Sequence, residues 1–471
     1  MDGLIKYAAQ VKPSERQVAV QEMEFYSFIH FTINTYTDKE WGHGDEDPAI
    51  FNPVEFDANQ WVDACRDSGM KGLILTCKHH DGFCLWPSQY TDHSVKSSPW
   101  KNGQGDIVKE VADACRIGGM KFGVYLSPWD RHEQSYGDSP KYNEYFLNQL
   151  RELLTNYGDI FCVWFDGACG EGPNGKRQEY DWDAYYALIH ELQPNAVINV
   201  CGPDIRWCGN EAGYCRESEW SVVPASLRSN EQIQEKSQRV DDGEFAKRYD
   251  STDRDLGSRE IIRKEPELVW YPAEVNTSIR PGWFYHASED DKVKSLEELL
   301  QVYYGSVGGN ATFLLNLPPD KRGLIHENDR ARLHELGEAI RNTFRTNLVE
   351  GASARASETL SGHHVNYIFD GNPDTYWCPE EGTEQVTIEV DLKDETEFNH
   401  VVLQEYRYSQ RIENFELEVQ QNGEWKPLWS GTVVGYKRIC RFDNVSSRYI
   451  RLKITESRWC PTISAFEVYC G

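Results

Sequence analysis

The chain has 471 residues, of which 39% are hydrophobic and 27% are charged, and its formal net charge is −27. This acidic balance argues against nucleic acid as a partner, because phosphate binding needs a positive field. No apolar run approaches the roughly 20 residues that span a bilayer, so no membrane span is predicted, and the length favours two domains.

The N-terminal stretch "MDGLIKYAAQVKPSERQ" contains no long apolar segment, so no signal peptide is predicted. The chain has 13 cysteines, an odd number, and several of them lie inside apolar runs. No CxxC pair has the spacing of a zinc site. Neither a disulfide framework nor a structural zinc is therefore expected.

A tandem repeat indicates the architecture of the first part of the chain. "DACRDSGMKGLILTC" at 63–77 matches "DACRIGGMKFGVYLS" at 113–127 at most positions. Each copy reads as the end of a helix, a glycine-containing turn and a short strand. An aspartate suited to N-capping opens each preceding helix, Asp57 and Asp106. Repeated αβ units predict parallel strands with helical crossovers.

Further apolar runs follow the same alternation. Strands are predicted at the ends of the two repeats and at 25–31, 160–165, 195–200, 267–275 and 311–317, with an eighth near 217–220. Helices are predicted near 140–156, 181–192, 292–304 and 327–345. Eight such units predict a (β/α)8-like TIM barrel over residues 1–346. A doubly wound sheet is the alternative, but no GxGxxG motif follows any of these strands.

The pattern changes after residue 348. Short alternating runs at 386–392, 400–406, 415–420 and 449–457 are separated by turn residues. This texture predicts an all-β jelly-roll sandwich over residues 349–471.

Polar and aromatic side chains follow the predicted barrel strands at their carboxyl ends, where TIM barrels carry their chemistry. These residues are His30, His79, His80, Tyr125, Trp129, Asp166, Arg206, Trp207, Glu211, Trp270 and Glu274. Taken singly, a strand-end aspartate is more often a helix cap and a histidine more often a structural hydrogen-bonding group. Their coincidence at one end of consecutive strands favours a functional site.

Two chemistries fit such a site. His79 and His80, with Asp81, suggest a metallohydrolase, but adjacent residues of an extended chain point to opposite faces, which disfavours one shared metal. Two carboxylates rimmed by indole and imidazole rings suggest a glycosidase instead. One carboxylate attacks the anomeric carbon while the other protonates the leaving oxygen.

The motifs at these strand ends resemble those of the α-L-fucosidases of glycoside hydrolase family 29. The matching stretches are "FIHFTINTYTDKEWG" (28–42), "KHHDGFCLWPSQYTDHSV" (78–95), "FGVYLSPWD" (122–130), "VWFDGA" (163–168) and "LLNLPPDKRGLIHENDRARLHELG" (314–337). "GNEAG…SEWS" at 209–221 resembles the subgroup that prefers branched α-1,3/1,4-fucosides.

The resemblance implies a retaining exo-α-L-fucosidase without a catalytic cofactor, acting on fucosylated oligosaccharides or glycans. Asp166 takes the position of the nucleophile and Glu211 that of the acid/base, with Glu217 and Glu219 as rivals for the second role. For a retaining enzyme the two carboxyl groups should lie about 5–5.5 Å apart. The implied substrate-binding residues are His30, Glu40, Trp41, His79, His80, Tyr125, Trp164, Arg206, Trp270, Glu274 and Trp283, the last three near the leaving sugar.

Residues 349–471 resemble the discoidin-like F5/8 type C domains, which include family 32 carbohydrate-binding modules. The resemblance rests on "SGHHVNYIFDGNPDTYWCP" (361–379) and "YIRLKITES…ISAFEVY" (449–469). It implies a structural Ca²⁺ ion held by oxygen ligands; "DGNPDT" also reads as a plain turn. The implied ligands are Asp370, Asn372, Thr375 and Glu467. His363, Trp429 and Tyr436 are candidates for a sugar platform.

Two alternative functions stay open at this point: a fucosidase of broad linkage specificity, and a catalytically inactive protein that binds fucose in the same pocket. The implied activity favours a periplasmic or extracellular location. The sequence gives no indication of the oligomeric state or of the physiological glycan.

Overall fold

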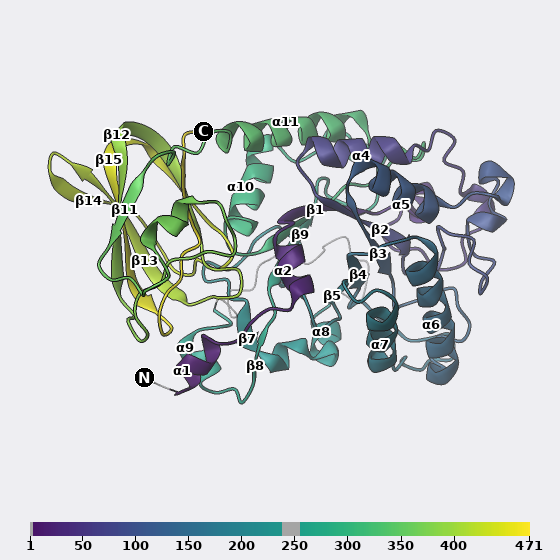
Figure 1. The fold of residues 1–471 in the computed structure, drawn as a ribbon. Coiled ribbons are helices and arrows are strands. Elements are labelled where there is room, and N and C mark those ends of the chain that lie inside the picture. Colours follow the sequence, from purple (N-terminus) through teal and green to yellow (C-terminus); the bar gives the residue numbers. More distant parts are fainter. Residues whose placement is uncertain (1–2, 238–254) are drawn as a thin grey trace.

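Eight parallel strands form the centre of the N-terminal part in the computed structural model, which describes residues 3–237 and 255–471 (Figure 1). Their order is β5-β4-β3-β2-β1-β10-β9-β6. A parallel bridge between Asn199 and Ile205 joins the two edges, so the sheet closes into a barrel. The strands are β1 (Phe25–Ile29), β2 (Gly72–Lys78), β3 (Lys121–Leu126), β4 (Cys162–Phe165), β5 (Val197–Val200), β6 (Arg206–Trp207), β9 (Ala273–Ser278) and β10 (Thr312–Asn316).

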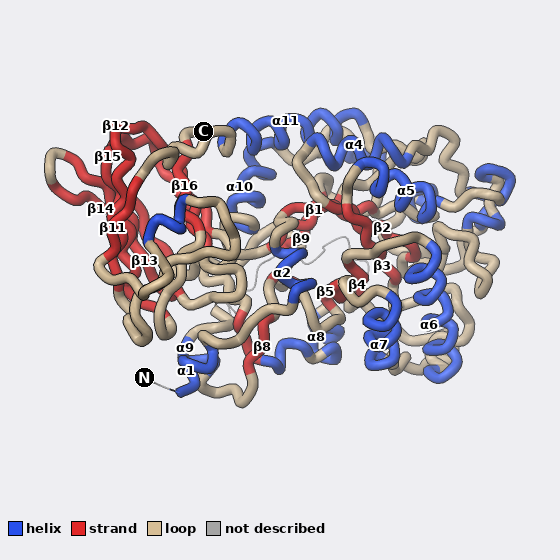
Figure 2. Tube along the Cα trace, viewed as in Figure 1, coloured by secondary structure: helices blue, strands red, loops and turns tan. Residues whose placement is uncertain are grey.

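Helices surround this barrel, as predicted, and Figure 2 shows them as an outer layer around the strands. The longer ones are α4 (Ala58–Asp67), α5 (Ile107–Gly118), α6 (Ser139–Asn156), α7 (Trp182–Leu192), α10 (Leu296–Ser306) and α11 (Glu327–Thr343). The N-terminal part also contains the shorter helices α1 (Gly3–Ala8), α2 (Glu15–Gln21), α3 (Asn34–Thr37), α8 (Asn230–Lys236) and α9 (Arg259–Ile262), of which α1 and α9 lie beside each other near the N-terminus (Figure 1). The helices predicted from the apolar periodicity are therefore present.

The tandem repeat forms two equivalent helix–turn–strand units. The Asp57 carboxylate accepts hydrogen bonds from the backbone at the start of α4, and Asp106 does the same for α5. Gly119 ends α5 with a φ of 71°, a left-handed conformation that favours glycine. The strands that follow, β2 and β3, pair in parallel.

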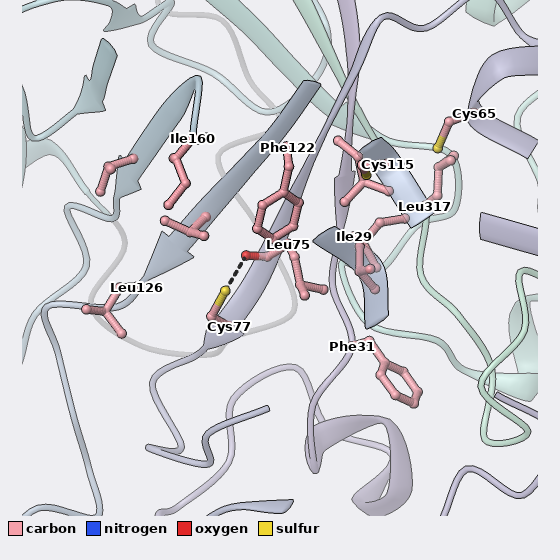
Figure 3. Packing of buried hydrophobic residues seen from close by; sticks show 14 of the residues in the cluster. Ile29, Phe31, Cys65, Leu75, Cys77, Cys115, Phe122, Leu126, Ile160 and Leu317 are labelled. Carbon is pink, nitrogen blue, oxygen red and sulfur yellow. Dashed lines mark hydrogen bonds between the residues drawn. The ribbon is translucent and has the colours of Figure 1, made fainter. Parts of the chain in front are cut away.

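The apolar faces of helices and strands meet in one continuous core. Figure 3 shows Cys65 of α4 and Cys115 of α5 near strand residues such as Ile29 and Phe122. All four side chains are buried. The cysteines act here as small apolar residues, and all thirteen cysteines of the chain are free thiols.

Two strand predictions are corrected by the structure. Residues 217–220 form no strand, and the sixth barrel strand is the two-residue β6, which pairs with β9. The predicted strand 267–275 divides at Tyr271–Pro272. Its first part, β8 (Leu268–Trp270), pairs outside the barrel with β7 (Val222–Pro224), and only its second part enters β9.

The C-terminal part is an antiparallel all-β domain with its own apolar core, seen on the left in Figure 1. Two predicted runs join into the single long strand β12, which is interrupted by register shifts. The strands are β11 (Ser353–Ala356), β12 (Val386–Gln404), β13 (Ile412–Gln421), β14 (Glu424–Gly431), β15 (Arg438–Ser457) and β16 (Ala465–Tyr469). No helix within the described residues has the length and apolar character needed to cross a bilayer.

Candidate active site

A pocket opens at the carboxyl ends of the barrel strands, where the sequence predicts the functional residues. Strands β1 to β6, β9 and the loops that follow them contribute to its wall. Of the predicted site residues, the pocket is lined by His30, Glu40, Trp41, His79, His80, Tyr125, Trp164, Asp166, Glu211 and Trp283.

Asp166 directly follows β4, and its side chain retains 25% exposure at the pocket. One carboxylate oxygen accepts the Tyr125 phenol at 2.9 Å and the other accepts the backbone N–H of Ala168 at 2.9 Å. A Cβ atom on Gly167 would approach Ser237 Oγ to 2.1 Å. Glycine therefore allows close packing behind the carboxylate, which is held in place yet open to the pocket.

The hydrogen bonds of His80 define its tautomer. Ser127 donates its hydroxyl hydrogen to the Trp129 carbonyl at 2.6 Å, so its oxygen accepts from His80 Nδ1–H at 2.7 Å. Burial lowers the pKa of His80 to about 4. At neutral pH its Nε2 is therefore an unprotonated acceptor, 3.8 Å from the Asp166 carboxylate.

His30 is arranged in the same way. The Asn316 amide donates to Ser278 and to the Trp283 carbonyl, so its oxygen accepts from His30 Nδ1–H at 2.8 Å. Burial lowers the pKa of His30 to about 3. His30 Nε2, like that of His80, is free to accept a hydrogen bond from a ligand hydroxyl.

Glu40 lines the pocket and holds the loop that follows β9. Its carboxylate accepts the backbone N–H groups of Trp283 and Phe284 at 2.9 and 3.2 Å. His286 bridges Glu40 and Asp38 at 2.7 Å each, and the hydrogen bond to Glu40 raises the pKa of His286 to about 9. Glu40 thus fixes the loop that carries the Trp283 indole into the pocket.

Glu211 enters the pocket from the segment between β6 and β7, here called the Glu211 loop (residues 208–221). Its carboxylate accepts the Trp283 indole N–H at 3.3 Å. The Asn210 side chain shapes the tip of the loop: its oxygen accepts the N–H of Ala212 and of Tyr214, and its amide donates to the Tyr214 carbonyl. Asp166 and Glu211 therefore face the same cavity from different loops.

The two rival carboxylates lie elsewhere. Glu219 is fully buried and pairs with Arg206 and Arg216 at the base of the Glu211 loop. Glu217 is exposed and does not line the pocket. Arg206, predicted to bind the sugar, is engaged in this ion pair and is also absent from the pocket wall.

The structure also places Trp270 and Glu274 outside the pocket. Trp270 ends β8 and belongs to a separate apolar cluster. Its indole N–H donates to the side-chain oxygen of Gln21. Glu274 is the second residue of β9, so it lies below the mouth of the barrel, fully buried. It accepts hydrogen bonds from Tyr26 and from the indole of Trp164, so it supports a pocket residue from beneath.

Several lining residues were not predicted from the sequence. They are Phe28, Val200, Ser237, Asn276 and Phe284, whereas Trp207, Gly167 and Ala168 belong to stretches that the sequence places at the site. Asn276 follows Glu274 by two residues on β9 and so shares its face of the strand. Extending the predicted strand to Ser278 would have identified it.

One argument against a metal site fails in the structure. Both His79 and His80 line the pocket, with ring centroids 4.1 Å apart, because the chain turns immediately after β2. With Asp166 they form a set of ligand atoms within 4.8 Å of one another, found among the described residues. The opposite-face argument is therefore wrong, and the metallohydrolase alternative needs a direct test.

The predicted calcium residues carry oxygen donors of the type that Ca²⁺ prefers. Asp370 follows the short helix η7 (Val365–Phe369), which contacts the β16 strand that carries Glu467. The Asp370 carboxylate accepts the Thr375 hydroxyl at 2.7 Å and the backbone N–H of Asn372 at 2.8 Å. The donor chemistry thus fits the ion, and the same bonds also close the loop as a turn.

Known protein families match both parts of the chain. Residues 7–343 match the alpha-L-fucosidase family and residues 353–467 match the F5/8 type C domain. Alpha-L-fucosidase 1 of Arabidopsis thaliana is 44% identical over 467 residues, covering 97% of this chain and 87% of the relative.

Solved structures extend the comparison. A Ruminococcus gnavus GH29 fucosidase in complex with fucose is 33% identical, with a TM-score of 0.85 over 98% of this chain and 95% of the other. A glycoside hydrolase 29 family member from an unknown rumen bacterium is 40% identical, with a TM-score of 0.80 over 98% and 78%. The chain therefore belongs to the alpha-L-fucosidase family of glycoside hydrolases and carries an F5/8 type C domain after its catalytic barrel.

Proposed function

We propose that the chain removes terminal α-1,3/1,4-linked L-fucose from fucosylated glycans with retention of anomeric configuration, with Asp166 as nucleophile and Glu211 as acid/base. The observation that carries this proposal is the convergence of these two carboxylates on one pocket. The rivals Glu217 and Glu219 lie outside that pocket, which supports Glu211 for the second role.

The proposed reaction has two displacements. Asp166 attacks the anomeric carbon and forms a fucosyl ester while Glu211 protonates the departing glycosidic oxygen. Glu211 then removes a proton from water, which attacks the same carbon, breaks the ester and releases fucose. The hydrogen bonds from Tyr125 and Ala168 to Asp166 orient the carboxylate for the first step.

The surrounding side chains are suited to a neutral sugar. The Nε2 atoms of His30 and His80 are acceptors for sugar hydroxyls, as the bonds at their Nδ1 atoms require. The rings of Trp41, Trp164 and Trp283 line the same pocket and offer apolar faces to C–H groups. A monosaccharide with several hydroxyls and one apolar edge fits this chemistry.

A second cavity supports a branched leaving group. It shares Glu211 and Trp283 with the first pocket and so continues from it on the far side of the proposed acid. Its other lining residues are Ala212, Thr277, Ser278, Arg280, Pro281 and Lys294. Polar groups at this position could bind the sugars that leave with the glycosidic oxygen, and this favours a glycan over a simple aryl fucoside.

Kinetics with two substrates test the proposal. Wild type should hydrolyse a trisaccharide bearing α-1,3- or α-1,4-linked fucose with a higher kcat/KM than an aryl fucoside. Asp166→Ala should lose at least roughly 1,000-fold in kcat on both substrates. Glu211→Ala should lose far more on the trisaccharide than on an aryl fucoside, whose leaving group needs little protonation.

Each alternative has its own outcome in this assay. Equal hydrolysis of α-1,2-, α-1,3- and α-1,4-linked substrates would establish broad linkage specificity instead. If wild type binds fucose but hydrolyses none of the fucosides, the protein is an inactive binding protein. Full activity of Asp166→Ala would refute the assignment of the nucleophile.

We also propose a structural Ca²⁺ ion in the C-terminal domain, held by Asp370, Asn372, Thr375 and Glu467. The support is the oxygen donor set of the loop at 370–375, which follows the η7 helix, and η7 contacts the β16 strand that carries Glu467. The ion would brace the loop and has no part in the reaction.

A further inference from the structure

The Glu211 loop is anchored at its base by a buried ion triad. The Arg216 guanidinium donates to the Cys208 carbonyl at 2.8 Å. This bond joins the second half of the loop to its first residue. The Glu219 carboxylate accepts the Arg216 backbone N–H at 3.1 Å and pairs with the Arg206 guanidinium. Because Arg206 belongs to β6, the triad ties both ends of the loop to the barrel.

The C-terminal domain holds the same segment from outside the barrel. Thr432 donates its hydroxyl and Arg438 its guanidinium to the Glu217 carbonyl, each at 3.0 Å. Gln410 accepts the Ser221 N–H at 2.6 Å and donates to the Glu219 carbonyl at 3.2 Å. Three side chains of the C-terminal domain thus bind the backbone of residues 217–221.

The two domains are also joined directly beside these contacts. The backbone of Asn310 donates to the Lys437 carbonyl at 3.0 Å, and its side chain accepts the Tyr436 N–H at 2.7 Å. The same Asn310 side chain donates to the Glu219 carbonyl at 2.8 Å. The start of β15 is therefore fixed to the barrel at the point where Arg438 reaches the Glu211 loop.

We infer that Gln410, Thr432 and Arg438 of the C-terminal domain are positioning residues for Glu211, so that this domain is part of the catalytic apparatus. The inference rests on the proposed role of Glu211 as acid/base. A general acid must lie within hydrogen-bond reach of the leaving oxygen, and a displacement of about 1 Å can cost on the order of 100-fold in rate. Loosening residues 217–221 would move Glu211 without touching the sugar or Asp166.

A leaving-group comparison tests this role. Arg438→Met and Gln410→Met should each lower kcat/KM for the fucosylated trisaccharide by about tenfold or more. The same variants should lower kcat/KM for a nitrophenyl fucoside less than about threefold, because a good leaving group needs little acid catalysis. Arg407→Met is the matched control, since Arg407 joins the C-terminal domain to Glu22 of the barrel away from the Glu211 loop. It should change the ratio of the two kcat/KM values very little.

An equal loss on both substrates would overturn the inference, because a merely structural role lowers the amount of folded enzyme and affects every substrate alike. If Arg438→Met does not fold, Thr432→Val replaces it in the test, because it removes only the hydroxyl that donates to the Glu217 carbonyl. Its loss of kcat/KM should also be confined to the trisaccharide, but should be smaller. Glu211→Ala separates the two proposals. Without a selective loss in Glu211→Ala, the acid/base assignment itself fails. With that loss, but none in the positioning variants, only the inference fails.

Discussion

Replacement of His286 by glutamine should make the enzyme less stable in a pH-dependent way. The protonated imidazole donates to both Asp38 and Glu40 at 2.7 Å, and the hydrogen bond to Glu40 is the main cause that raises its pKa from 6.5 to about 9. A shift of that size corresponds to about 3 kcal/mol, at 1.36 kcal/mol for each pKa unit. Solvent screening at this partly exposed site reduces the expected contribution to about 2 kcal/mol.

The sign follows from the raised pKa. The contribution is fully present below the unfolded value of 6.5 and is lost as the pH rises through about 9. His286→Gln should therefore lower Tm by roughly 2–3 °C at pH 6 and by much less at pH 10. Thermal unfolding followed by intrinsic fluorescence between pH 5 and pH 10.5 measures the difference.

His334→Gln is the matched control, because His334 pairs with Asp67 in an exposed position on α11. Exposed pairs contribute little to stability, so this variant should change Tm only slightly at either pH. An equal Tm loss for His286→Gln at pH 6 and pH 10 would refute the argument, since it would show that the side chain acts by packing and not by its charge.

Three further predictions concern the pocket and the C-terminal domain. Tyr125→Phe removes the phenol hydroxyl that donates to Asp166. It should lower kcat/KM by about ten- to a hundredfold for the fucosylated trisaccharide and for the aryl fucoside, since a hydrogen bond to a charged group contributes about 1.5–3 kcal/mol. A loss confined to the trisaccharide would contradict this. Incubation with a zinc chelator should leave activity unchanged, whereas a loss restored by added zinc would favour a metal at His79, His80 and Asp166. Removal of calcium by EGTA should lower the Tm of wild type but not that of Asp370→Ala, and identical shifts in both would contradict the proposed calcium site.

The sequence predicts much of the barrel because its units repeat. The match between 63–77 and 113–127 places helix, turn and strand in register, and the apolar faces need no tertiary information to be recognised. The apolar run 160–165 likewise predicts that Asp166 follows the end of a strand. The same reasoning misses β6, because a strand of two residues contains too few positions to show any period.

The errors at the site have local physical causes. A single apolar run was predicted for 267–275, but the chain leaves one sheet at Trp270 and enters another at Ala273. Because β9 continues to Ser278, Glu274 lies one layer below the pocket. Asn276, two residues further along the same strand, lines the pocket at the position predicted for Glu274. His79 and His80 share one cavity because β2 ends at Lys78, a boundary that periodicity does not locate to one residue. The contacts between Gln410 and the Glu211 loop join residues nearly two hundred positions apart, and no local pattern reveals them.

Rescue by azide tests the central assignment most directly. In Glu211→Ala, an activated aryl fucoside can still form the fucosyl ester with Asp166, and azide should then attack that ester and give the α-fucosyl azide. In Asp166→Ala, azide should enter the vacated space and displace the leaving group directly, giving the β-fucosyl azide. Proton NMR of the two products distinguishes the anomers. This pairing of variant and anomer is the predicted result, and the β-azide from Glu211→Ala together with the α-azide from Asp166→Ala would contradict the proposed roles.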